Sequence, residues 1–208
     1  MKNKFYIIQI LIITFISFIN ISHIDAEDLI INAEEIDIKD KGNVIVASGY
    51  ININDNDDIS IKGNQASYFK LNEKVEISGN VIFFDKEKNF QAKSDRLIFD
   101  RKNNIVKTSG NTIITVFDEK NENVDFEIKG DNTFFDQNRR ILEINKNVIF
   151  EDNLNFIEII SEKIIYYGNE KLVKSFNDTK INYKNDFFIN TKNISYNKIK
   201  KNFFTQEK

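Results

Sequence analysis

The sequence predicts an all-β fold in which similar units stack along one axis. Three observations lead to this class. A short motif recurs at intervals of 30 to 36 residues, and apolar residues alternate with polar ones inside each interval. No stretch after the N-terminal segment keeps a helical period. Self-similarity at such a spacing is typical of folds in which each unit buries its apolar face against its neighbours.

Each unit is marked by a small residue that a polar residue follows. These pairs begin at Ala33, Gly63, Ser94, Gly130, Ser161 and Thr191, so that the spacings are 30, 31, 36, 31 and 30 residues. A bulky apolar residue follows five positions after each small one: Ile38, Tyr68, Phe99, Phe135, Tyr166 and Tyr196. A further residue typical of turns recurs at Gly49, Gly79, Gly110, Lys146 and Asn177. We interpret each unit as strand, corner, strand, turn and strand.

The apolar residues change parity at each small-polar pair, as between Ile61 and Tyr68 on either side of Gly63. Alternation cannot cross such a step without turning the apolar face outward, so the strand must bulge or bend there. Polar segments such as 70–73 and 100–104 have the length and composition of hairpin turns.

An extended set of strands that is apolar on one face must bury that face. A sandwich, an open barrel and a stacked solenoid would all do so. The bend inside every unit favours a V-shaped, stacked open β-jelly roll, in which two sheets face each other across a long apolar interior.

The first 26 residues are predicted to be an export signal. Lys2 and Lys4 precede an apolar run from Phe5 to Ile21, and Ala26 is a suitable small residue before a cleavage point. The alternative is an uncleaved anchor, because the run is close to the shortest helix that spans a bilayer. We therefore expect a signal peptide at 1–26 and one exported β domain at 27–208.

The composition argues against most enzymes. The chain has no Cys, and its one His, His23, lies in the predicted signal. Triads with His or Cys and the usual zinc ligand sets are therefore excluded from the exported domain. Carboxylate pairs remain, but no placement of Asp or Glu singles one out. The net charge of −3, with both signs interspersed, argues against nucleic acid as a partner. We expect no catalytic residues, cofactor or metal.

Two units resemble a known family. The segments Ile61–Tyr68 and Ala92–Asp100 resemble its strand pattern, and Ser78–Val81 and Ser109–Thr112 resemble its Ser-Gly-Asn motif. The family is the OstA-like domain of lipopolysaccharide transport, found in the periplasmic bridge protein LptA and at the N-terminus of the outer-membrane assembly protein LptD. The resemblance spans residues 29 to 196 and weakens where Lys146 and Asn177 replace Gly.

The resemblance implies a domain that binds and relays lipopolysaccharide through the periplasm toward the outer membrane. The acyl chains of lipid A would lie in an apolar groove between the sheets. The residues expected to line it are Ile61, Tyr68, Ile77, Phe83, Leu97, Phe99, Ile128, Phe135, Ile144, Phe150, Ile159 and Tyr166. The other expected partners are further OstA-like bridge domains, which would add edge to edge, and the outer-membrane translocon. The residues expected at the docking edges are Leu29, Ile31, Ile36, Ile38, Phe187, Ile189, Ile194 and Tyr196.

Among family members, the N-terminal portion of LptD is favoured, because the repeat runs almost from residue 27 to the last residues of the sequence. A stand-alone bridge component fits if no barrel follows, and the membrane-anchored bridge component fits if the N-terminal segment is not cleaved. Outside the family, a structural or adhesive β-solenoid would share the repeat and the export signal but would have a closed core. A carboxylate-based glycosidase would need two acids that converge in a cleft.

Overall fold

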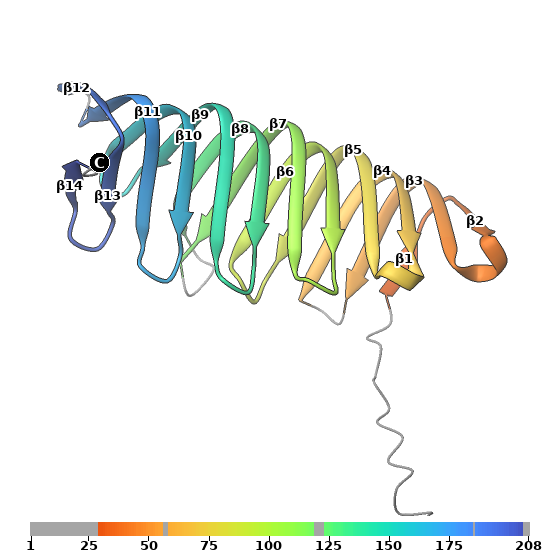
Figure 1. Ribbon diagram of the computed structural model, residues 1–208. Coiled ribbons are helices and arrows are strands. Elements are labelled where there is room, and N and C mark those ends of the chain that lie inside the picture. Colours follow the sequence, from red (N-terminus) through yellow and green to blue (C-terminus); the bar gives the residue numbers. More distant parts are fainter. Residues whose placement is uncertain (1–28, 56–57, 119–122, 185, 206–208) are drawn as a thin grey trace, which may run out of the picture.

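The computed structural model describes residues 29–55, 58–118, 123–184 and 186–205. Fourteen strands form one antiparallel sheet, in which the long strands follow each other in sequence order (Figure 1). The strands are β1 (Leu29–Asn32), β2 (Glu35–Lys39), β3 (Val44–Asp55), β4 (Ile59–Phe69), β5 (Lys74–Asp85), β6 (Phe90–Asp100), β7 (Ile105–Phe117), β8 (Val124–Asp136), β9 (Ile141–Asp152), β10 (Ile157–Tyr167), β11 (Leu172–Tyr183), β12 (Phe187–Lys192), β13 (Ile194–Asn197) and β14 (Asn202–Thr205). Two short 3-10 helices, η1 (Asp40–Gly42) and η2 (Lys70–Asn72), lie in the turns after β2 and β4. The predicted signal peptide lies outside the described residues.

Every long strand bends once near its middle, where its pairing with its neighbours shifts register. These corners lie at 49–50, 63–64, 79–80, 94–95, 110–111, 130–131, 146–147, 162 and 177–178. The corners divide the sheet into two arms. The first arm holds β1, β12 and the strand halves in line with them, and the second arm holds β2, β13, β14 and the other halves. The sheet is therefore V-shaped in cross-section and open at both ends.

The corners correct one sequence interpretation. Gly49, Gly79 and Gly110 are not hairpin turns but corners inside β3, β5 and β7. Each has a φ between +73° and +82°, a conformation that glycine adopts without steric cost. A Cβ atom on Gly79 would come within 2.9 Å of Asn64, the corner residue of β4. The Ser-Gly-Asn motif is thus explained by a left-handed corner that packs closely on the corner of the preceding strand. The hairpin turns lie where 70–73 and 100–104 predict them.

Replacing Gly110 by Ala should destabilise the fold by about 2–3 kcal/mol, because positive φ costs about 1 kcal/mol and the new methyl group must displace Asp95. A Cβ on Gly110 would lie 2.3 Å from Oδ2 of Asp95, which accepts a hydrogen bond from Asn111. Gly42→Ala is the matched control, since its φ is +97° but no atom lies within 4 Å of the added Cβ. Urea unfolding of Gly42→Ala should show a decrease of only about 1 kcal/mol in the free energy of unfolding. An equal decrease in the free energy of unfolding for both variants would contradict the explanation from close packing against Asp95.

Apolar side chains from both arms fill the space between them as one continuous core. The prediction of an all-β, open, stacked fold is confirmed. In the part of the chain that the structure describes, no helix has the length and apolar character needed to cross a bilayer.

Candidate functional site

All twelve residues predicted to line the groove point into the interior. Eleven of them are buried, and Tyr68 is partly buried. Aromatic rings from the two arms meet there: Phe90 stacks on Phe135 with centroids 4.4 Å apart, and Phe126 lies edge-on to Tyr166 at 4.6 Å. The sequence pattern therefore identified the inward face. Whether these residues line a lipid groove stays a prediction.

The interior is filled by its own side chains. Ile61, Phe83, Ile128 and Phe150 are each 0% exposed. A ligand between the arms would therefore have to displace side chains or separate the arms, since such cores are packed as densely as organic crystals.

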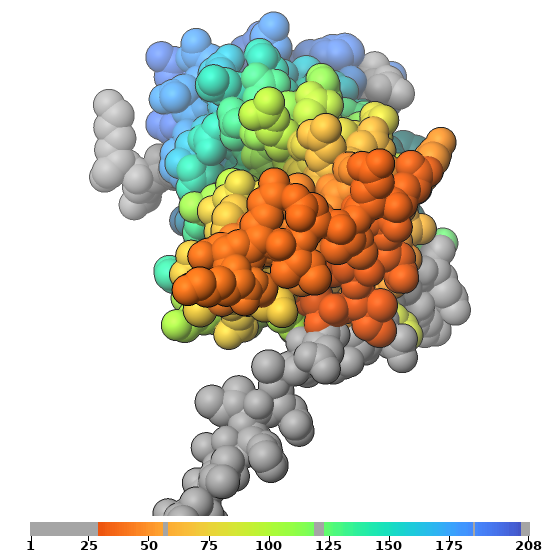
Figure 2. Space-filling model, turned by 90° about the vertical axis from the view of Figure 1, so that its right-hand side faces the viewer, coloured from red at the N-terminus to blue at the C-terminus, as the bar shows by residue number. Residues whose placement is uncertain are grey.

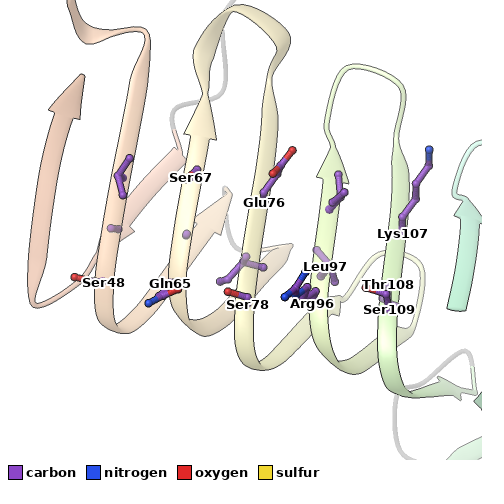
Figure 3. A pocket seen from close by; sticks show the side chains of 15 residues that line it. Ser48, Gln65, Ser67, Glu76, Ser78, Arg96, Leu97, Lys107, Thr108 and Ser109 are labelled. Carbon is purple, nitrogen blue, oxygen red and sulfur yellow. The ribbon is translucent and has the colours of Figure 1, made fainter. Parts of the chain in front are cut away.

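A hollow lies on the outer face of the second arm. This outer furrow has a volume of about 750 Å³ and crosses β3 to β7 (Figure 3). Five of its fifteen lining residues, Ala47, Ala66, Ile77, Leu97 and Thr108, are buried residues of the inward rows. The other ten come from the parity opposite to the core. They include Ser48, Gln65, Ser67, Glu76, Ser78, Arg96, Lys107 and Ser109.

Polar contacts tie the free rims of the arms together, and sequence reasoning missed them. The Arg101 guanidinium lies 2.9 Å from Oδ2 of Asp55, and Gln137 donates to the Asp85 carboxylate. Near the C-terminal end, the Lys198 ammonium lies 2.7 Å from Asp152. We call these three contacts the rim rungs. In each, an Asp at the end of a first-arm strand meets a residue from a second-arm hairpin.

The rungs differ in their electrostatics. Burial raises the pKa of the Asp85 carboxyl, and the backbone N–H and the charge of Lys88 offset this effect only in part. Burial also disfavours the charged form of Asp152, but hydrogen bonds from Lys198 and Asn155 outweigh it and lower the pKa. For Arg101, desolvation is outweighed by attraction to Asp55, so the guanidinium pKa is raised. The ionic rungs are therefore paired charges that are largely shielded from water.

The N-terminal end of the interior is open. Ile36 and Ile38 of β2 lie on the inward rows, in register with Ala47 and Ile45, yet they are 50% and 65% exposed. Leu29 and Ile31 of β1 are partly buried. Figure 2 shows this end, with β1 to β3 across the front in red and orange. Of the four predicted docking residues at this end, Ile36 and Ile38 are therefore exposed and Leu29 and Ile31 are partly buried. All four lie on strands that have no further neighbour among the described residues.

The C-terminal end differs from the prediction on one arm. Phe187 and Ile189 of β12 are 63% and 47% exposed at the edge of the first arm. On the second arm, β14 pairs with β13, and Phe203 stacks on Tyr196 with centroids 4.9 Å apart. Ile194 and Tyr196 are consequently buried and are not edge residues. The motif spacing ended at Tyr196 and gave no sign of the additional strand.

Among residues 29–55, 58–118, 123–184 and 186–205, no group of three or more His, Cys, Asp or Glu side chains could hold a metal ion.

No protein-family model and no curated protein matches the sequence. Among solved structures, the fold is similar to that of LptH from Pseudomonas aeruginosa, described as the LptA-homologous periplasmic component of the conserved lipopolysaccharide transport device. The two share 16% sequence identity over 57% of this chain and 82% of that chain, with a TM-score of 0.49. At this identity, the function has to be argued from this chain's own residues.

Proposed function

We propose that this chain is a non-enzymatic periplasmic domain that binds the acyl chains of lipopolysaccharide between its arms and relays them to a like domain. The observation that carries the proposal is the exposure of inward-facing apolar residues at the ends of an otherwise continuous apolar interior. Ile36 and Ile38 continue the inward rows of the core, and no strand of the described residues lies beyond them.

The chemistry of the interior supports a lipid as the ligand. Thirty apolar residues from both arms form one cluster that runs the length of the sheet. Burying a methylene group contributes about 0.8 kcal/mol, so an acyl chain gains affinity without any directed polar contact. Such binding needs no catalytic group.

The open edges support relay to a second domain. The edge strands β1 and β2 present unpaired backbone groups beside exposed apolar side chains, and β12 does so at the other end of the first arm. Strands of this kind pair readily with another chain. A like domain added there would lengthen both the sheet and the apolar interior. We expect the outer-membrane translocon to engage the chain in the same manner.

Photocrosslinking to lipopolysaccharide at β2 tests the proposal. A photoreactive side chain replaces Ile38 in one variant and Asp37 in another; both positions are exposed, but they lie on opposite faces of one strand. We expect adducts from position 38 and few from position 37. Equal labelling at both positions, or none from a folded protein, would contradict the proposal.

The filled interior favours one other function, that of an exported structural or adhesive β-solenoid. Such a protein needs a closed core and no ligand, and the burial of Ile61 and Phe83 agrees with this. The same crosslinking separates the two, because a structural solenoid gives no adducts confined to the inward face.

A further inference from the structure

The series of rim rungs has a gap between its second and third members. Along the rim of the first arm, Asp85 is in register with Phe90, Phe90 with Val116, and Val116 with Phe126. Val116 therefore holds the place on β7 that Asp85 holds on β5. A valine at this position offers no group to form a rung.

Glycine occupies the facing place on the second arm. The rung residues Arg101, Gln137 and Lys198 each donate their backbone N–H to a carbonyl of the neighbouring hairpin turn, and Gly168 does the same to Arg140 at 2.8 Å. Val116 and Gly168 are also as far apart in sequence as Asp85 and Gln137, 52 residues. Since Gly168 has no side chain, no rung can form between this residue and Val116.

A small opening lies at this gap, with a volume of about 60 Å³. Val116 and Gly168 line it, together with Phe90, Phe135 and Tyr166 from the core. We call it the rim port. It has room for about two water-sized groups and borders the aromatic interior directly.

Within the described part of the chain, the Tyr166 hydroxyl has no hydrogen-bond partner, although the residue is only 5% exposed. A buried hydroxyl without a partner is costly, so its persistence calls for an explanation. Burial also raises the pKa of this phenol, which therefore remains a hydrogen-bond donor at neutral pH. A ligand in the rim port could accept this bond.

The rim port is surrounded by cations. Lys88 from the first arm and Arg140 and Lys171 from the second line it. Lys88 pairs with Glu87, whose carboxyl pKa is lowered first by that hydrogen bond and also by the nearby Arg140 charge. The carboxylates of Asp85 and Asp125 also lie near this site, Asp85 beside Lys88 and Asp125 beside Tyr166. The residues that line the rim port nevertheless include three basic side chains and no acidic one, and this lining suits a phosphate.

We propose that the rim port is a lateral entrance that admits the acyl chain of an anionic amphiphile while its phosphate is held by Arg140 and Lys171. This inference rests on the proposed lipid binding and adds the place of entry and the headgroup chemistry. The arms are tied by rungs on both sides of the rim port but not at it. Separating the arms at the rim port therefore requires no rung to break there.

Installing the absent rung tests the entrance. Val116→Asp with Gly168→Arg copies the Asp55–Arg101 rung and leaves the net charge unchanged. The probe is monomeric dodecyl phosphate, measured by calorimetry. We expect the rung variant to lose about tenfold or more in affinity, because each excluded methylene removes about a factor of four. Val116→Phe, which fills the port without charge, should act in the same way if the double variant fails to fold.

The charge variant Arg140→Gln/Lys171→Gln tests the headgroup site. Its affinity for dodecyl phosphate should fall about tenfold, while its affinity for the uncharged dodecyl maltoside should not change. An equal loss for both probes, or no loss, overturns the phosphate assignment. The proposed entrance is wrong if the folded rung variant, or the Val116→Phe variant, binds dodecyl phosphate with the affinity of the wild type. It is also wrong if the wild type does not bind dodecyl phosphate. The crosslinking at Ile38 would then still decide the proposed function by itself.

Discussion

Replacing Phe99 by Asp should prevent the domain from folding at 25 °C. Phe99 is 1% exposed and lies edge-on to Phe83 with ring centroids 5.4 Å apart. Removing a buried phenyl ring costs about 3–5 kcal/mol, and burying an unpaired carboxylate costs several more. The sum is comparable to the whole stability of a typical domain, about 5–15 kcal/mol.

Circular dichroism and urea unfolding measure this effect directly. Lys93→Asp is the matched control, because it introduces the same residue into the same strand β6 at an exposed position. Its effect on the free energy of unfolding should stay below about 1 kcal/mol. If Phe99→Asp unfolded cooperatively and its free energy of unfolding also fell by less than about 1 kcal/mol, the inward face of β6 would be assigned wrongly.

The stacking of bent strands could be predicted because it rests on local patterns. The parity change at Ser94 requires a bend in β6 for any strand with one apolar face, and the structure places a corner there. The inward set, including Phe99 and Phe135, follows from the same alternation. Gly79 was misread as a turn because Gly followed by Asn is typical both of hairpin turns and of left-handed corners. Only its contact with Asn64 on the neighbouring strand separates the two.

The rim could not be predicted, because its contacts depend on how the arms meet. Asp55 and Arg101 are 46 residues apart, and an Asp at a strand end looks the same whether it caps a turn or bridges two arms. That Val116 stands where other strands carry a rung Asp became apparent only from the strand register, and its place near Gly168 only from the lining of the rim port. Burial of Tyr196 depended on a strand beyond the last recognised repeat.

Removing Lys198 should be the most costly change at the rim. Its ammonium lies 2.7 Å from Asp152, which is 0% exposed, and 3.2 Å from Asp125. Lys198→Met keeps much of the side-chain volume but leaves two carboxylates without their cation. Breaking a buried pair in this way costs about 3–5 kcal/mol. The double variant Lys198→Met/Asp152→Asn should recover most of this loss, since it leaves no unpaired charge at Asp152.

The pH dependence of unfolding gives this rung a signature that a purely steric role would lack. The Asp152 pKa is lowered in the folded state, so the unfolded chain binds its proton first as the pH falls. The stabilisation is therefore complete above the unfolded carboxyl pKa of about 3.9 and disappears as the pH falls through the lower folded value. Urea unfolding should show this acid-dependent loss in the wild type and a shallower one in the double variant. Parallel pH profiles would mean that Lys198 stabilises the rim through its packing over Phe126, 5.0 Å from the ring centroid, and not through its charge on Asp152.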